Sequence, residues 1–535
     1  MNKYDRPEDL GYTYTWENMP RDEEGFIQLI PKHPIGKTDS FKRRFMYTDQ
    51  PEIILHHGHI SITNYKMGDN FEFEKSLSVW NKMTFRYELI GGYYISEYRE
   101  FCINRGYDLQ RLKNFFPDRP MRVVNDPFPS DPIDIELYAP PRSDFQKVAL
   151  TFMTHQDIYS SIKHTQQIID ADTGDGKTYC GVATTAYWKH KVIIFVPFSK
   201  LLDQWKDAFT TFTSVNDYEI MIIQGSTACE KILAGKCHHI KVFICSMDTI
   251  TSFQKKHGNL RTIELLKATG AYIKIIDEIH RDIRAVSMIE ALSNFRLNYY
   301  MSASPGRAEQ KENWIFRTLF KNVPQFGSTF KTQEEKHITV MIKKFKWTPD
   351  YKQIKAMVNN KTGLNIKAYE RELINSPQFQ RQSFDDAITV LLNWAKGVMK
   401  PGKRLMLMAQ SIETLFYIQK LAEKVFPGET SVYYGGLSKK EKAAALEKKI
   451  IVATDSSLGT GANIPELQFL IYCSTYSNWL NARQLSGRLR KLNDGTQVVY
   501  IELLNVGYLK TMKQFDKRKG ELQRRSKTGK LFFVE

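Results

Sequence analysis

The chain has little of what marks an exported or membrane-bound protein. Its six cysteines carry no paired spacing, as is usual for reduced thiols in a reducing compartment; they are Cys102, Cys180, Cys229, Cys237, Cys245 and Cys473. The opening residues, MNKYDRPEDLGYTYTW, have no apolar core of a secretory signal, and no run of about 18 apolar residues occurs. We therefore expect an intracellular, cytoplasmic protein without a membrane partner.

Clusters of metal-ligating residues are also scarce. His56-His57-Gly58-His59 and Cys237-His238-His239 could each supply ligands, but neither has a matching second half elsewhere in the chain. Polar residues at strand ends or in loops are the favoured interpretation of both. No zinc, nuclease or methyltransferase signature occurs, so we expect no second chemistry.

The composition is that of a globular protein with a basic surplus. The 535 residues are 42% hydrophobic and 13% aromatic, enough for about three or four domains of ~150 residues. Lys and Arg number 76 against 59 Asp and Glu, a net charge of +17. Such a surplus favours polyanionic partners, with nucleic acid first and an anionic membrane second.

A glycine-rich turn, ADTGDGKT at 171–178, lies between an apolar run ending at Ile169 and a helical pattern starting at Thr178. Such a turn presents backbone N–H groups at a positive helix end, Lys177 adds a mobile charge, and Thr178 offers a hydroxyl for Mg²⁺. Ala171 stands where the P-loop pattern has Gly, and a plain surface turn is the alternative. The predicted phosphate-binding residues are Thr173, Gly174, Asp175, Gly176, Lys177 and Thr178.

Two further features fit a nucleotide site. In KIIDEIH, an apolar strand delivers Asp277 and Glu278 side by side, so that Asp277 could hold Mg²⁺ and Glu278 could activate water. Gln146 begins a helical pattern upstream, and its carboxamide has the donor and acceptor that an adenine edge requires. Ser302 and Ser304 close another strand, either coupling the carboxylates to the rest of the domain or capping a helix.

The sequence predicts four segments. They are an accessory domain (1–135), a first α/β domain (136–330), a second α/β domain (331–507) and a basic helix and tail (508–535). Proline clusters near 127–141 mark the first boundary, and the accessory segment contains apparent hairpins at Gly58 and at Gly91-Gly92. Beyond 165, short apolar runs alternate with helical patterns, as in doubly wound parallel sheets. Backbone-phosphate contact and plain solvation are both open for the basic segment.

The second α/β series ends in NARQLSGRLRK, residues 481–491. Gln484, Arg488 and Arg490 are expected about one turn apart on a helix. Arginines delivered to a γ-phosphate stabilise charge during phosphoryl transfer. A solvated basic helix is the alternative.

Taken in order, these motifs resemble a superfamily 2 helicase of the DExH type over roughly residues 137–505, in the branch of the phage UvsW, XPB and large-DNA-virus helicases. The likeness rests on Gln146, ADTGDGKT, VPFSKLLDQW, ICSMDTI, DEIH, SAS, LMLMAQS, ATDSSLGTGANIP and QLSGRLRK. It implies two RecA-like lobes with ATP and Mg²⁺ bound between them, Thr178 and Asp277 at the metal, and Arg488 as the arginine finger.

The resemblance also implies contacts to a nucleic-acid backbone. The residues implied are Gln224, Gly225, Thr249, Gln410, Ser411, Gly435 and Thr454. Three departures stand out: Asn463 replaces the usual Asp, Lys491 takes the last arginine's place so that Arg490 comes one residue early, and Ser304 replaces Thr.

The sequence thus predicts an ATP-dependent DNA helicase or translocase that remodels branched DNA and participates in recombination. We expect a monomer, in the host cytoplasm if phage-encoded. RNA is the alternative partner, giving a transcript-release helicase. The other alternative is an ATP-dependent clamp that binds nucleic acid without unwinding it.

Overall fold

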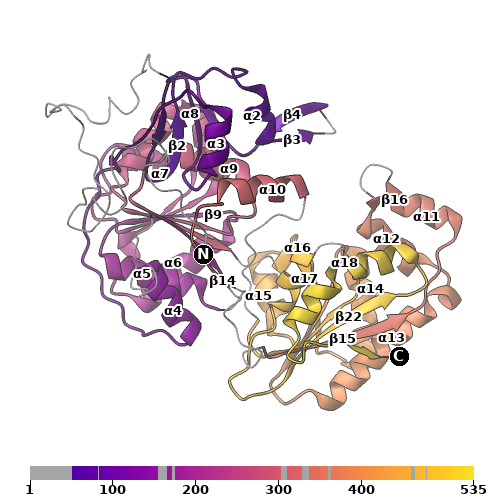
Figure 1. Ribbon diagram of the computed structural model, residues 1–535. Helices are drawn as coiled ribbons and strands as arrows, with labels where there is room; N and C mark the ends of the chain where they lie inside the picture. Colours follow the sequence, from indigo (N-terminus) through magenta and orange to yellow (C-terminus); the bar gives the residue numbers. More distant parts are fainter. Residues whose placement is uncertain are drawn as a thin grey trace. The chain divides into compact units, whose positions relative to one another are not determined.

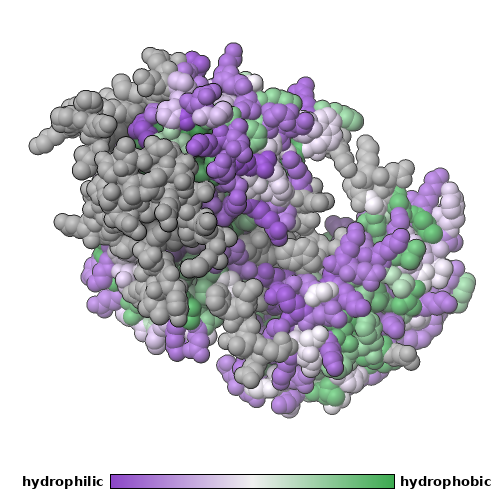
Figure 2. Space-filling model, in the orientation of Figure 1, coloured by the Kyte–Doolittle hydropathy of each residue, from purple (hydrophilic) through white to green (hydrophobic). Residues whose placement is uncertain are grey.

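The computed structural model describes residues 51–81, 84–154, 165–171, 175–302, 310–327, 336–359, 363–458, 464–476 and 479–534. These residues divide into two compact units, unit 1 up to residue 327 and unit 2 from residue 336 onward (Figure 1). Within the described ranges, no helix is both long and apolar enough to cross a membrane. On the face drawn in Figure 2, hydrophilic residues cover most of the coloured surface.

Unit 1 begins with a mixed five-stranded sheet in the order β5-β6-β2-β1-β7. Its strands are β1 (Ile53–Leu55), β2 (His59–Ile62), β5 (Tyr93–Ile95), β6 (Glu100–Asn104) and β7 (Met121–Val123). Helices α2 (Phe71–Ser76) and α3 (Leu109–Phe115) accompany it, and β3 (Ser78–Asn81) pairs with β4 (Arg86–Leu89) in a separate hairpin. The predicted turn at Gly58 is confirmed, because β1 and β2 pair antiparallel across it.

The predicted hairpin at Gly91-Gly92 is wrong. Strand β4 pairs with β3, and β5 pairs with β6, so the strands on either side of the glycines do not pair with each other. Close packing explains these glycines better than a turn does. A Cβ would come within 2.6 Å of Ile315 at Gly91 and within 2.6 Å of Phe101 at Gly92.

The remainder of unit 1 is a parallel seven-stranded sheet in the order β10-β11-β9-β12-β13-β8-β14, as the β/α alternation predicts. Its strands are β8 (Gln166–Asp170), β9 (Val192–Val196), β10 (Ile220–Ile223), β11 (Val242–Ser246), β12 (Ile273–Asp277), β13 (Leu297–Ser302) and β14 (Gln325–Gly327). Its helices are α4 (Asp144–Met153), α5 (Lys177–Trp188), α6 (Lys200–Phe212), α7 (Gly225–Leu233), α8 (Met247–Ala268), α9 (Ile283–Ala291) and α10 (Gln310–Leu319).

The central strands β9, β11, β12 and β13 of this sheet are buried on both faces. Val192 and Ile194 of β9 pack with α4, α5 and α6, whereas Ile193 and Phe195 point into a second core with α7, α8 and α9. Figure 1 shows these two groups of helices on opposite sides of the strands. The second core also contains residues of the N-terminal sheet, including Ile60 and Phe101. The two sheets of unit 1 therefore share one hydrophobic core. The boundary at 135/136 stays a prediction.

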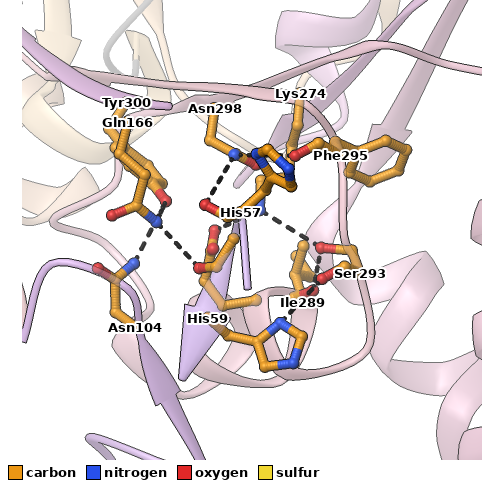
Figure 3. Close-up of polar contacts among 12 residues, drawn as sticks. His57, His59, Asn104, Gln166, Lys274, Ile289, Ser293, Phe295, Asn298 and Tyr300 are labelled. Carbon is orange, nitrogen blue, oxygen red and sulfur yellow. Dashed lines mark hydrogen bonds and ion pairs between the residues drawn. The ribbon is translucent and has the colours of Figure 1, made fainter. Parts of the chain in front are cut away.

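Polar groups join the same two sheets (Figure 3). The carboxamide of Gln166 donates to Gly58 O at 2.9 Å and to Tyr300 Oη at 2.8 Å, and Asn104 donates to the same hydroxyl at 3.2 Å. Nearby, Lys274 Nζ lies 2.6 Å from Glu290 Oε1, with both side chains at most 1% exposed. Burial lowers the pKa of Lys274 and raises that of Glu290. Each charge therefore depends on the other.

The histidines of the β1–β2 turn belong to this network. His56 lies 3.1 Å from Asp126, His57 Nε2 lies 2.8 Å from Asn125, and His59 Nδ1 lies 3.1 Å from Ser293 O. Burial lowers the pKa of His57 to about 4. Among the described residues, no group of three or more His, Cys, Asp or Glu could hold a metal ion. Their contacts place the three histidines among polar residues at the strand ends, and the absence of a metal role stays a prediction.

Unit 2 contains a second parallel seven-stranded sheet, in the order β19-β20-β18-β21-β22-β15-β23. Its strands are β15 (Ile338–Phe345), β18 (Arg404–Ala409), β19 (Thr430–Tyr433), β20 (Ile450–Thr454), β21 (Leu467–Tyr472), β22 (Val498–Asn505) and β23 (Phe532–Val534). Its helices are α11 (Tyr351–Met357), α12 (Ile366–Asn375), α13 (Gln378–Val398), α14 (Ile412–Val425), α15 (Lys439–Glu447), α16 (Asp455–Leu458), α17 (Trp479–Ser486) and α18 (Leu509–Arg525). A short β16 (Val358–Asn359) pairs with β17 (Gly363–Leu364).

The basic C-terminal segment is part of this unit. Helix α18 forms where the helical pattern predicts one, and the chain then pairs β23 with β15 at the edge of the sheet. Arg518 of α18 is fully buried with Glu502 of β22, and its guanidinium lies 4.3 Å from the Tyr476 ring centroid. This buried pair holds α18 against the sheet. It therefore fixes which side of the helix faces the sheet.

The Lys274–Glu290 pair gives a test of the packing in unit 1. Lys274→Met should lower the free energy of unfolding of unit 1 by about 3–5 kcal/mol, because it leaves Glu290 buried without its cation. Combining it with Glu290→Gln should restore much of the loss. Urea unfolding followed by circular dichroism measures both, with Lys255→Met on the exposed face of α8 as the control. Equal stabilities of the Lys274→Met single and double variants would contradict the account.

Candidate nucleotide and nucleic-acid sites

The candidate residues of unit 1 gather at one edge of its parallel sheet. Parallel strands end at a common edge, where α/β proteins bind their ligands. Strands β8, β12 and β13 end at Asp170, Asp277 and Ser302. Strands β10 and β11 end just before Gln224 and Met247. The topology therefore collects segments that lie far apart in the sequence.

The phosphate-loop candidate connects β8 to α5. Gly176 caps α5 with φ of 87°, a left-handed conformation that suits glycine. Lys177 Nζ donates to Ala171 O at 2.8 Å, across the loop. Helix α5 has no acidic residue in its first turn, so its positive end is not offset there. Thr173 and Gly174 lie outside the described residues, and their predicted phosphate contacts stay predictions.

Gln146 contacts this loop directly. Its side chain is 7% exposed, donates to Asp175 O at 3.2 Å and accepts from Arg142 N at 2.7 Å. A Cβ on Gly176 would come within 2.0 Å of the Gln146 Nε2 atom, so a larger residue there would displace the Gln146 side chain. Gln146 thus packs against the loop. Its reading of an adenine edge stays a prediction.

Asp277 and Glu278 form a buried acidic pair, each 5% exposed. Asp277 Oδ1 accepts from Glu278 N at 2.9 Å, and Asp277 Oδ2 accepts from Trp205 Nε1 at 3.0 Å. Burial, with the charge of Glu278, raises the pKa of Asp277 to about 6, while Lys177 opposes the shift. The electrostatic effect of Lys177 on Asp277 means that the two charges sense each other. Strands β8 and β12 both pair with β13, so the loop lysine and the acidic pair follow strands at one edge of the sheet. Their membership of one site stays a prediction.

Glu278 has a strained backbone. Its φ is 50°, which side-chain-bearing residues seldom adopt and which concentrates at functional sites. Its Oε2 lies 3.2 Å from His280 Nδ1, and the same nitrogen lies 2.7 Å from Ser302 Oγ. Ser302 thus contacts the carboxylate segment through His280, in line with the coupling interpretation. Ser304 lies outside the described residues.

The oxygens available here fit Mg²⁺. Magnesium prefers carboxylate and hydroxyl oxygens, together with substrate phosphates and water. Asp277 supplies a carboxylate, and Thr178 supplies a hydroxyl that accepts from Gln204 at 3.4 Å. A bound cation would offset the cost of burying two adjacent carboxylates. The assignment of Thr178 and Asp277 to the metal stays a prediction.

Two residues of this site escape the sequence reasoning. Trp205 orients Asp277 from α6, and His280 joins Glu278 to Ser302. Both lie inside segments that carry the family resemblance, VPFSKLLDQW and DEIH. Their place in these motifs is the only signal in the sequence that could have pointed to them. Their roles depend on contacts between residues 72 and 22 positions apart, respectively.

The remaining candidates in unit 1 follow the two outer strands. Gln224 and Gly225 come after β10, and Gly225 has φ of 72°. Thr249 lies in the first turn of α8, where its N–H donates to the Ser246 hydroxyl at 3.2 Å. Gln224 and Gly225 are exposed, and Thr249 is partly exposed. They lie on the carboxyl edge, and their contact with a nucleic-acid backbone stays a prediction.

In unit 2, Gln410 and Ser411 follow β18. Their N–H groups donate to the carboxylate of Glu370 at 2.8 and 2.7 Å. Glu370, from α12, is 1% exposed, and burial raises its pKa against the effect of these bonds. The sequence reasoning missed Glu370, which fixes the turn that carries both candidates. In the sequence, nothing in the helical pattern around Glu370 distinguishes it from a solvent-exposed glutamate.

Gly435 and Thr454 follow β19 and end β20, at the same edge of the unit 2 sheet. Gly435 O accepts from Lys442 Nζ at 3.0 Å, and the buried Thr454 hydroxyl accepts from Ser457 N at 3.2 Å. Thr454 thus caps the turn that begins α16. Gly461 and Asn463 lie outside the described residues.

The predicted helical placement of the two arginines is wrong. Helix α17 ends at Ser486, Arg488 lies in the turn that follows it, and Arg490 lies beyond that turn. Gly487 disfavours continuation of the helix. Beyond it, the backbone forms hydrogen bonds to the residue three positions earlier, from Arg488 N to Leu485 O (3.2 Å) and from Leu489 N to Ser486 O (3.1 Å). Gln484 lies within α17, and its side chain lies outside the described residues.

Arg488 has a perturbed environment. Its side chain is partly buried. Burial lowers the pKa of Arg488 to about 10, and Asp455 acts in the opposite direction. The guanidinium remains charged at neutral pH. Arg490 is exposed.

Comparison with known proteins gives matches over part of the chain. Residues 141–307 match the family described as "Type III restriction enzyme, res subunit". "Transcript termination protein A18" of Yaba-like disease virus is 25% identical over 334 residues, 59% of this chain and 62% of that protein. Its namesake in fowlpox virus is 21% identical over 335 residues, with 59% and 64% covered. The chain thus covers less than two thirds of these relatives.

Among solved structures, the chain is similar to "S. cerevisiae Dbp5 bound to RNA and ADP BeF3" with a TM-score of 0.47 and 13% identity, covering 73% of this chain and 89% of that one. A second structure, "S. cerevisiae dbp5 l327v bound to gle1 h337r and ip6", has a TM-score of 0.48 and 14% identity over 73% and 88%. The family match covers residues 141–307, which is less than half of the chain.

Proposed function

We propose that this chain is an ATP-dependent DNA helicase or translocase that remodels branched DNA. The observation that carries the proposal is the grouping of the Lys177 loop with the buried Asp277–Glu278 pair at one sheet edge. Phosphoryl transfer needs little covalent chemistry from a protein. It needs positioned cations and an oriented water.

Each residue of the site has a proposed role. Lys177 neutralises negative charge on the phosphates, and the first turn of α5 offers its N–H groups. Glu278 accepts the proton of the attacking water, with His280 and the strained backbone fixing its carboxylate. Asp277, held by Trp205, would hold Mg²⁺. The metal, when bound, neutralises charge on the phosphate oxygens.

Unit 2 is proposed to contribute Arg488, with Gln484 and Arg490 beside it in sequence. An arginine at the γ-phosphate makes turnover depend on the arrangement of the two units, which is how a motor couples hydrolysis to movement. The candidates after the strands of both sheets, from Gln224 to Thr454, are proposed to contact the nucleic-acid backbone. The net charge of +17 favours such a partner.

A second candidate function is a helicase that acts on RNA or releases transcripts. The observation in its favour is the similarity to poxvirus proteins named for transcript termination. The DNA proposal rests on the resemblance of the motifs to the UvsW-like branch. The two proposals share the ATP site and differ in the polynucleotide that stimulates it.

A clamp that binds nucleic acid without turnover is a weaker alternative. A binding module has no need of a general base, and the buried Glu278 costs stability to maintain. Release of phosphate by the purified protein over many turnovers would exclude the clamp.

The choice of polynucleotide can be measured directly. At one fixed low salt concentration, steady-state ATP hydrolysis should be stimulated by DNA, and most strongly by a four-way junction. The comparison includes no polynucleotide, single-stranded DNA, duplex DNA and single-stranded RNA. Stimulation by RNA alone would contradict the DNA proposal and support the transcript-release candidate.

Trp205 gives a second test. Trp205→Phe keeps an aromatic ring at this position but removes the indole N–H that holds Asp277. ATP turnover should therefore fall about 10-fold, as expected for the loss of a hydrogen bond to a charged group. The matched control is Trp188→Phe, which removes the indole bond to Tyr299 at 3.1 Å in the same unit. Equal turnover in the two variants would show that Trp205 does not position Asp277.

A further inference from the structure

The β3–β4 hairpin and the neighbouring helix α2 expose large aromatic side chains. Phe71 is 57% exposed, Trp80 48%, Phe85 72% and Tyr87 46%. We call these four residues the hairpin surface. They lie within 17 consecutive positions, 71–87. Exposed aromatic residues that gather in this way mark interaction sites rather than ordinary surface.

Three of the four rings form one connected group. Trp80 and Tyr87 are cross-strand partners, and their ring centroids lie 5.0 Å apart in an edge-on arrangement. Lys75 Nζ lies 5.7 Å from the Phe71 ring centroid and 5.8 Å from that of Tyr87. In Figure 2, apolar and hydrophilic residues lie side by side over this hairpin. Cations and aromatic faces are thus interleaved.

Phe85 adds a second, independent observation. Its φ is 51°, a left-handed conformation that is unfavourable for a bulky residue. A strained residue normally regains the cost through packing, but the Phe85 ring is 72% exposed. Strain of this kind concentrates at ligand-contacting segments.

The hairpin surface is flanked by cations as well as by carboxylates. Lys66 and Arg86 are exposed, and the side chain of Lys75 is 40% exposed. Two of the nearby carboxylates are already engaged: Glu74 accepts from Tyr65 Oη and Gly68 N, and Glu88 pairs with Arg284. Glu72 lies 3.8 Å from Lys75 Nζ, and Asp69 remains at the rim.

The hairpin is also anchored to helix α9. Arg284 and Ser287, both in α9, bind Glu88 and the Ile90 carbonyl oxygen, the latter at 3.0 Å. Helix α9 begins at Ile283, three residues after His280. The hairpin surface therefore rests on the helix that directly follows the acidic pair.

We propose that the hairpin surface is a stacking platform for the unpaired bases of single-stranded nucleic acid. Every base has a flat face, so aromatic rings bind single strands with little regard to sequence, and flanking cations follow the backbone. A duplex keeps its base faces stacked internally and offers none to the rings. The proposal deepens the proposed function, on which it rests, by assigning a single-strand site outside the parallel sheets.

Binding of labelled oligonucleotides tests the proposal. Fluorescence anisotropy of fluorescein-labelled oligothymidylate, oligouridylate and a blunt DNA duplex gives three affinities for each variant. Trp80→Ala and Phe85→Gly should each weaken both single strands about 5-fold or more and leave the duplex unchanged. Phe85→Gly relieves the left-handed strain, so its effect cannot come from unfolding. Tyr351→Ala and Phe379→Ala, at residues 81% and 79% exposed in unit 2, are matched controls.

The outcomes separate this proposal from the function on which it rests. Single-strand affinities of the two variants equal to wild type would overturn the stacking platform, while the ATPase and its stimulation stand. A similar loss in the unit 2 controls, or an equal loss for the duplex, would also overturn it. A wild-type protein that binds no polynucleotide at all would overturn the proposed function itself.

Discussion

The burial of two adjacent carboxylates is the constraint on which the rest of unit 1 depends. Asp277 and Glu278 are both 5% exposed, and charges so placed repel each other in a medium that screens poorly. The raised pKa of Asp277 expresses that cost. The N–H groups of Trp205 and Glu278, together with the charge of Lys177, offset part of it. The arrangement requires a strand, a helix and a loop to meet at one edge, which the parallel sheet provides.

The N-terminal sheet is physically part of the same unit. It shares a hydrophobic core with the parallel sheet, and the buried polar contacts of Gln166, Tyr300 and Asn104 join the two. Polar groups that satisfy each other in a buried interface specify one arrangement, because any shift leaves them unpaired. A ligand bound to the N-terminal segment would therefore act on a body that includes the acidic pair.

The sequence predicts the sheets well because the physics behind them is local. Apolar runs such as residues 192–196 alternate with helical patterns, and that alternation alone requires parallel strands with crossover helices. The same rule predicts that Asp277 and Lys177 lie at one edge of the sheet, because the carboxyl ends of parallel strands share that edge. Contacts made at a distance could not be predicted in this way. Trp205 and Glu370 are fixed by partners on other elements, and the glycines at 91–92 serve packing rather than a turn.

The central claim is that the buried acidic pair drives ATP hydrolysis, and the Glu278→Gln variant tests it most directly. Gln keeps the size of the side chain but cannot accept a proton, so steady-state hydrolysis should be abolished while a fluorescent ATP analogue still binds. Lys177→Ala, measured alongside, should lose hydrolysis as well, because it removes the charge that neutralises the phosphates. Hydrolysis by Glu278→Gln at the wild-type rate would contradict the assignment of this site.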